Sequence, residues 1–171
     1  MDSNRSAAAA ADPVAALSNS WFGAGLSPEA VARLAALATI RDVPAGEELL
    51  HEGAITETFA IVLSGRVALR MLVPERGMVT ILTVEPGDVL GWSAIVPPHR
   101  ATSSSIAIEP VRMLELPGHP LRALLRSDYA LAASVYPRVL QAVARRLAAT
   151  RLQLLDLFAR EEIGRQEVVA W

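Results

Sequence analysis

The sequence has no cysteine and no lysine among its 171 residues. Without cysteine, the chain cannot form a disulfide framework, a thiolate nucleophile or a cysteine-ligated iron–sulfur cluster. All sixteen basic residues are therefore arginines, and eighteen acidic residues bring the net charge to only −2. A charge this close to zero provides no general electrostatic attraction for nucleic acid.

Long apolar runs are also missing. No stretch reaches the roughly 18 consecutive apolar residues that a membrane-spanning helix needs, so we expect no membrane span. The alanine-rich N-terminus carries Asp2 and Asp12 and lacks the leucine-rich core of a signal peptide, so we expect a cytoplasmic location. The composition that is present, 52% apolar and 20% charged residues, is typical of one globular domain with a real core.

The first forty residues predict a polar tail followed by two helices. Residues 1–12 are poor in bulky apolar side chains, and we expect them to be disordered. Asp12 is a suitable N-cap for a helix over residues 13–22. Ser27 is a clearer N-cap for a helix over residues 28–38, because proline and glutamate follow it in the first turn.

Between Ile40 and Leu116 the pattern changes to short runs of β-branched and aliphatic residues, separated by turn glycines and prolines. Closely spaced short strands of this kind are typical of a β-roll or jelly roll. The expected strands cover residues 40–43, 48–52, 58–63, 66–72, 78–84, 89–90, 101–108 and 111–116. The predicted class is therefore α+β, with a jelly-roll core (a double-stranded β-helix) flanked by N-terminal helices and a long C-terminal helix.

The helical period returns after Pro117, with a short helix over residues 121–126 and a long one over residues 128–160. The long helix closes the predicted domain of residues 13–160, and we expect the polar residues 161–171 to form a frayed tail. One stripe of the long helix has heptad spacing and consists of Leu140, Val143, Leu147, Thr150, Leu154 and Leu157. The stripe is suited to packing on the β-roll and also to the seam of a parallel homodimer, in which the polar threonine would set the register.

The same long helix carries a basic face, which consists of Arg138, Arg145, Arg146 and Arg151. A face of this kind is usually solvated, and we interpret it so. Direct DNA binding would need a helix-turn-helix domain after this helix, and the eleven residues that follow Arg160 are too few for one. We therefore expect no direct binding to DNA.

A candidate anion-binding segment, here called the cassette, covers residues 85–102 with the sequence EPGDVLGWSAIVPPHRAT. The small residues Gly91, Ser93 and Ala94 precede Arg100 in it. Glycine allows close approach of the backbone, and free N–H groups at a helix start favour negative charge. Arginine adds a planar fork that matches phosphate or carboxylate.

Five segments follow one another in a characteristic order: AGEELLHEG at 45–53, FAIVLSGRVAL at 59–69, VEPGDVLG at 84–91, RAT at 100–102 and RRLAAT at 145–150. This order resembles the cyclic-nucleotide-binding domain of the catabolite activator protein (Crp–Fnr) family, from about Leu26 to Leu157. The positions that match the family's recurring residues are Gly46, Glu47, Glu52, Gly53, Gly65, Gly87, Asp88, Gly91 and Arg100.

The resemblance implies a ligand site formed by the cassette and the long helix. It implies that Arg100 holds the phosphate of a cyclic nucleotide, cAMP or cGMP, and that Thr150 contacts the purine. It also implies a homodimer, no covalently bound cofactor and no metal. The residues expected to bind the ligand are Gly91, Trp92, Ser93, Arg100, Ala101, Thr102 and Thr150.

Trp92 departs from the family, which has a glutamate here that accepts a hydrogen bond from the ribose 2′-hydroxyl. A tryptophan N–H only donates, and losing a hydrogen bond to a charged group costs about 1.5–3 kcal/mol, or roughly ten- to a hundredfold in affinity. Three interpretations stay open: a cyclic nucleotide, another small anionic ligand on which Trp92 stacks, or a degenerate pocket that serves as an interaction module.

Enzymatic chemistry has little support in the sequence. His51, His99 and His119 have no metal-binding spacing, and the H-x-H pattern of metal-binding cupins, which share a similar β-roll, is absent. No Ser–His–Asp set is indicated either. We therefore predict a non-enzymatic, small-molecule-sensing regulatory domain that acts through a dimer or an unknown partner protein. The alternatives are a transcription regulator that has lost its DNA-binding domain and, less favoured, a cupin-like enzyme.

Overall fold

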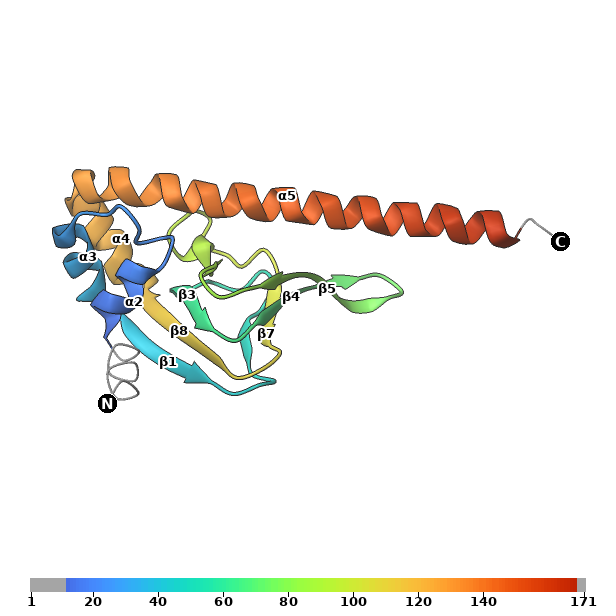
Figure 1. The fold of residues 1–171 in the computed structure, drawn as a ribbon, viewed down its shortest axis with the longest axis horizontal. Helices are drawn as coiled ribbons and strands as arrows, with labels where there is room; N and C mark the ends of the chain where they lie inside the picture. The colour runs from blue at the N-terminus through green and yellow to red at the C-terminus, as the bar shows by residue number, and fades with distance from the viewer. Residues whose placement is uncertain (1–11, 169–171) are drawn as a thin grey trace.

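Two antiparallel sheets form a β-roll, and helices cover one end and one side of it (Figure 1). This computed structural model describes the backbone of residues 12–168 and the side chains of residues 12–153. Nearly all of the predicted N-terminal tail and the last residues of the predicted C-terminal tail therefore lie outside the described residues.

The strands lie close to their predicted positions. One sheet has the order β1-β8-β3-β6 and the other β2-β7-β4-β5, so the chain crosses between the sheets at every connection except the β4–β5 hairpin and forms a jelly roll. The predicted fold class is confirmed. The bounds are β1 Thr39–Val43, β2 Glu48–Leu50, β3 Thr58–Ser64, β4 Val67–Val73, β5 Gly77–Val84, β6 Val89–Leu90, β7 Ser104–Ala107 and β8 Val111–Pro117.

Strand β3 explains why this sequence makes two cores. Successive side chains of a strand point to opposite faces of the sheet. Phe59 and Ile61 are buried under the helices, whereas Ala60 and Val62 are buried between the two sheets. The continuous apolar run of β3 therefore specifies a strand that is covered on both faces.

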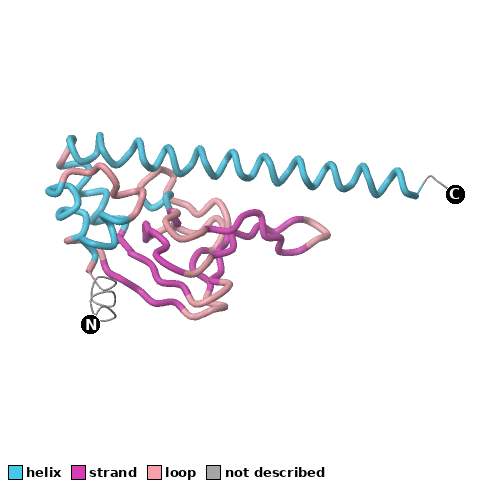
Figure 2. The backbone as a smooth tube through the Cα atoms, viewed as in Figure 1, coloured by secondary structure: helices cyan, strands magenta, loops and turns pink. Residues whose placement is uncertain are grey.

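The two N-terminal helices begin at their predicted caps. The Asp12 side chain accepts a hydrogen bond from the Val14 N–H, and the Ser27 side chain accepts one from the Ala30 N–H. Figure 2 shows the three short helices gathered at one end of the β-roll, next to the start of the long helix. The helix bounds are α2 Pro13–Asn19, α3 Pro28–Ala35, α4 Gly118–Ser127 and α5 Tyr129–Val168.

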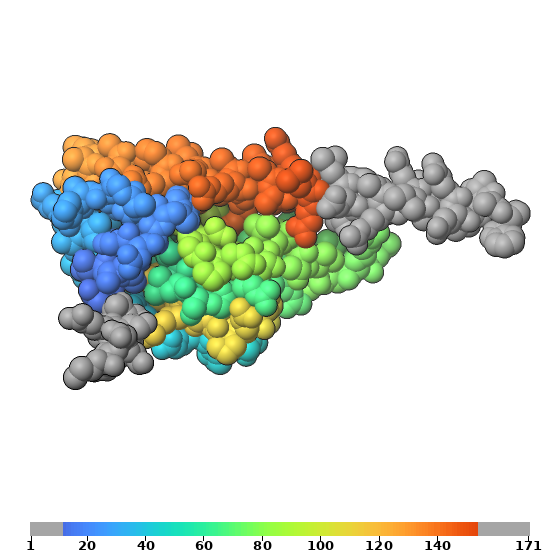
Figure 3. All heavy atoms as spheres, viewed as in Figure 1, coloured from blue at the N-terminus to red at the C-terminus, as the bar shows by residue number. Residues whose placement is uncertain are grey.

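Helix α5 lies along the β-roll (Figure 3). Its buried side chains Val135 and Val139 belong to the same core cluster as Phe59 and Ile61 of β3. The helix runs to Val168, so the predicted end near Arg160 and the predicted frayed tail from residue 161 were placed too early. The reason is that residues 161–168 contain no proline, and their single glycine costs only about 1 kcal/mol relative to alanine. None of the described helices is long and apolar enough to cross a membrane.

Candidate functional site

A pocket of about 210 Å³ lies between α5 and the β-roll. Three of the expected ligand residues line it: Trp92 and Thr102 from the cassette, and Thr150 from α5. The pocket therefore brings together segments that are far apart in the sequence. The other lining residues are Leu69, Ile81, Leu82, Ser103, Val143, Arg146 and Leu147.

Gly91 places the tryptophan at the pocket wall. It follows β6 in the left-handed conformation, with φ of 68°, and opens the short 3-10 turn Trp92–Ala94. A Cβ atom on Gly91 would lie 2.2 Å from the carbonyl oxygen of Thr58 in β3. Only glycine accepts both the backbone conformation and this close approach.

The cassette is held from inside by hydrogen bonds. The buried hydroxyls of Ser93 and Thr56 lie 2.9 Å apart, and the Nδ1 atom of His99 lies 3.1 Å from the carbonyl oxygen of Ser93. Ser93 is not among the residues that line the pocket. Its contacts therefore fix the shape of the cassette.

Arg100 lies apart from the pocket lining. Its side chain is exposed, and its Nη1 atom donates to the carbonyl oxygen of Gly53 at 2.7 Å. The next residue, Ala101, is buried, and its backbone pairs with Ala54. The expected arginine is thus present in the cassette, but here it fastens the cassette to the loop before β3.

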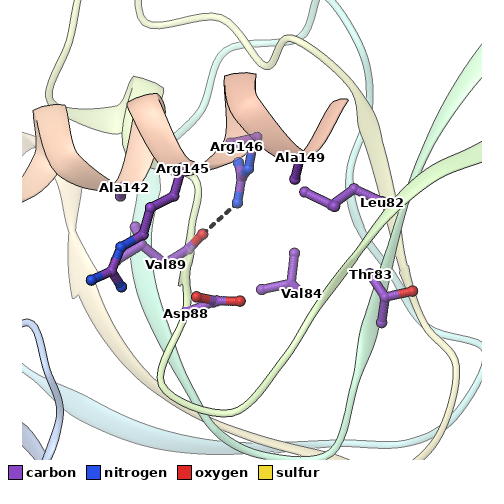
Figure 4. A pocket seen from close by; sticks show the side chains of 9 residues that line it. All are labelled: Leu82, Thr83, Val84, Asp88, Val89, Ala142, Arg145, Arg146 and Ala149. Atoms are coloured by element: carbon purple, nitrogen blue, oxygen red, sulfur yellow. Dashed lines mark hydrogen bonds between the residues drawn. The ribbon is translucent and has the colours of Figure 1, made fainter. Parts of the chain in front are cut away.

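Arg146 of α5 is the cation that reaches the pocket. Its Nη2 atom donates to the carbonyl oxygen of Val89 at 2.6 Å, and it also lines a smaller cavity of about 130 Å³ with Asp88 on the opposite side (Figure 4). Burial lowers the pKa of Arg146, an effect that the nearby charge of Asp88 opposes. The guanidinium therefore lines both cavities, and it contacts the β-roll through its hydrogen bond to the carbonyl oxygen of Val89.

The heptad stripe divides between the pocket and the outer surface. Val143, Leu147 and Thr150 line the pocket, whereas Leu140 is 67% exposed and Leu147 remains 52% exposed. The Thr150 hydroxyl donates to the carbonyl oxygen of Arg146 at 2.9 Å. The side chains of Leu154 and Leu157, also predicted for the seam, lie outside the described residues.

The prediction of a solvated basic face was wrong for two of its four arginines. Arg138 is half-buried and donates to the carbonyl oxygens of Ser134 and Ala24, and Arg146 is half-buried and lines the pocket. Arg145 is exposed, as predicted, although it also stacks 4.6 Å above the ring of Trp21. Arg151 is exposed as well. The sequence held one signal for Arg146, since this arginine follows the apolar Val139 by seven residues and so shares its side of the helix.

The lining combines polar and apolar side chains. Its described residues offer three hydroxyls, one guanidinium, one indole and aliphatic side chains. Within residues 12–153, no group of three or more histidine, aspartate or glutamate side chains is placed to hold a metal ion. The arrangement can hold a small molecule by apolar contact, hydrogen bonds and one positive charge.

Comparison with known proteins places these features in one family. The family model described as the cyclic nucleotide-binding domain matches residues 40–128. A CRP-like cAMP-activated global transcriptional regulator of Mycobacterium tuberculosis is 32% identical over 142 residues, which cover 82% of this chain and 61% of the relative. The chain therefore spans about three fifths of that relative's length.

Solved structures support the same fold. The catabolite activator protein of Thermus thermophilus is 26% identical with a TM-score of 0.63, and the match covers 82% of this chain and 64% of that one. A cyclic nucleotide-binding domain from Methylobacillus flagellatus KT has a TM-score of 0.73 at 23% identity, with coverage of 85% and 82%. The second likeness concerns the fold alone.

Proposed function

Since the chain belongs to the cyclic nucleotide-binding domain family, we propose that it is a small-molecule-sensing regulatory domain whose ligand binds between the cassette and α5. The observation that carries the proposal is the pocket that Trp92, Thr102 and Thr150 line from two distant elements. A ligand in this pocket contacts the β-roll and α5 together. Its binding therefore biases how α5 packs, provided that it prefers one packing over another.

The output of the sensor passes through α5 to a second copy of the chain or to a partner protein. Exposed apolar side chains on α5, including Leu140 and Leu147, support this, because large apolar patches are uncommon on monomers. Parallel pairing of two α5 helices would cover these leucines and place both Thr150 side chains beside the seam. The name of the mycobacterial relative, a transcriptional regulator, supports a regulatory rather than an enzymatic role for this chain. That the chain itself does not contact DNA stays a prediction, as does its cytoplasmic location.

The test uses a pocket-filling variant and a matched control in the same strand. Ile81→Trp places an indole in the pocket, whereas Met78→Trp places one on a residue of β5 that is already 42% exposed. Wild type and Met78→Trp should carry the same co-purifying small molecule in mass spectrometry of the native protein, and Ile81→Trp should lose it. Adding that molecule should slow amide hydrogen exchange in residues 143–150. The proposal fails if no small molecule, cyclic AMP and cyclic GMP included, changes exchange there.

A further inference from the structure

The walls of the Trp92 pocket are apolar on most sides. Leu69, Ile81 and Leu82 line it from β4 and β5, Val143 and Leu147 line it from α5, and the Trp92 ring adds a flat aromatic surface. Apolar walls of this kind favour a ligand with an apolar or aromatic body, because burial of its surface is favourable in proportion to area.

None of the described residues that line the pocket replaces the acid that would recognise a ribose. The hydroxyl groups of the lining belong to Thr102, Ser103 and Thr150, and none of the lining residues between positions 12 and 153 carries a carboxylate. The Thr150 hydroxyl already donates its hydrogen bond to the carbonyl oxygen of Arg146. The free 2′-hydroxyl of a cyclic nucleotide would therefore lose its bonds to water without gaining a charged acceptor.

Among the described residues, the charge in the lining comes from Arg146 and not from Arg100. Within residues 12–153, Arg146 is the only charged side chain that lines the pocket. Its guanidinium has one acceptor in the described part of the chain, the carbonyl oxygen of Val89, and no carboxylate partner within ion-pair distance. Several N–H groups are therefore left for a ligand, and the single positive charge matches a single negative one.

The volume limits the size of the ligand. A cavity of about 150 Å³ with aliphatic walls accommodates benzene, and pockets for drug-sized molecules begin near 300 Å³. The pocket of about 210 Å³ lies between these values. It has room for one ring or one branched chain with a short acidic group, and it is small for a purine, a ribose and a cyclic phosphate together.

We propose that this pocket takes a compact apolar monocarboxylate without a sugar, whose carboxylate pairs with Arg146 while its ring or branched chain packs against Trp92. The inference rests on the proposed function, because it names the ligand class of the same site. A ligand carboxylate would then share the Arg146 guanidinium with the carbonyl oxygen of Val89, and so it would connect ligand charge to the contact between α5 and strand β6 of the cassette.

The first experiment needs no variant and compares two probes of the same shape. Benzoate carries the negative charge at neutral pH, and benzamide is neutral. Ligand-observed NMR titrations of the wild-type protein should show benzoate binding ~10- to 100-fold more tightly than benzamide, as expected for one charge-assisted hydrogen-bonded pair. Equal affinity for the two probes would overturn the proposal.

Two arginine variants then separate the candidate cations. Arg146→Gln should remove the preference for benzoate over benzamide, and Arg100→Gln should leave it unchanged, because Arg100 is exposed and bonded to Gly53. Far-ultraviolet circular dichroism checks that both variants fold. If Arg146→Gln does not fold, the comparison of benzoate with benzamide on the wild-type protein alone tests the proposal. Loss of the preference in Arg100→Gln alone would also overturn the proposal.

A cyclic AMP titration separates failure of this inference from failure of the proposed function. If cyclic AMP binds and benzoate does not, the carboxylate assignment is wrong while the sensor function stands. If benzoate and phenylacetate do not bind at millimolar concentration, the carboxylate assignment is wrong. The proposed function is wrong as well only if cyclic AMP, cyclic GMP and any co-purifying molecule leave amide exchange in residues 143–150 unchanged.

Discussion

Replacing Gly91 by alanine tests the geometry that sets the cassette against the β-roll. The residue combines a left-handed backbone, with φ of 68°, and a position where a Cβ would lie 2.2 Å from the carbonyl oxygen of Thr58. Carbonyl oxygens of a central strand cannot move freely, because β3 is paired on one side with β8 and on the other with β6. The added methyl group must therefore displace the cassette.

The expected loss of stability has two parts. A non-glycine residue in the left-handed region costs about 1–2 kcal/mol. Overpacking by one methyl group adds about 1–3 kcal/mol when the neighbours are rigid. Gly91→Ala should therefore lower the free energy of unfolding by about 2–5 kcal/mol, and it should also shift Trp92 and weaken ligand binding.

Gly46→Ala is the matched control. Gly46 also has a positive φ, 87°, but no heavy atom lies within 4 Å of an added Cβ there. This variant should lose only about 1–2 kcal/mol, the backbone part of the cost. Urea unfolding followed by circular dichroism measures both variants, with the slope m unchanged. Equal losses in the two variants would show that the clash with Thr58 does not occur, and the placement of Trp92 would then be wrong.

Three further predictions concern assembly, acid stability and ligand choice. Leu147→Asp should convert a dimer to a monomer or an aggregate in light scattering, since a buried unpaired charge at the helix seam is costly. The control Leu152→Asp lies outside the heptad stripe and should leave the mass unchanged, and a monomeric wild type would refute the seam. The hydrogen bond from the Leu131 N–H lowers the pKa of Asp128, so the wild type should have a higher free energy of unfolding than Asp128→Ala at pH 7. This difference in free energy should narrow as the pH falls below about 4 through the lowered pKa, and a difference that stays constant with pH would contradict the prediction. Trp92→Glu should strengthen cyclic AMP binding by roughly ten- to a hundredfold in calorimetry and weaken benzoate binding, and unchanged affinities in a folded variant would assign Trp92 to the core.

Local signals in the sequence were sufficient for the fold. The N-caps at Asp12 and Ser27, the turn glycines between short strands and the return of helical spacing after Pro117 act within a few residues of where they stand. The close spacing of these short strands predicted the jelly-roll class, and the family resemblance supported it. The end of α5 was misplaced because a polar composition does not stop a helix that lacks a breaker.

The site depended on contacts that sequence spacing does not report. The sequence by itself determined a glycine-led turn at Gly91 and a long helix that carries Thr150, and the family resemblance implied that the two form one ligand site. Only the tertiary structure decided that Arg100 bonds to Gly53 outside the pocket and that Arg146 turns into it. The physical reason is that a side chain's direction depends on how α5 is rotated on the β-roll and on which carbonyl oxygens, such as that of Val89, need a donor. Both are set by packing between segments that are far apart in the chain.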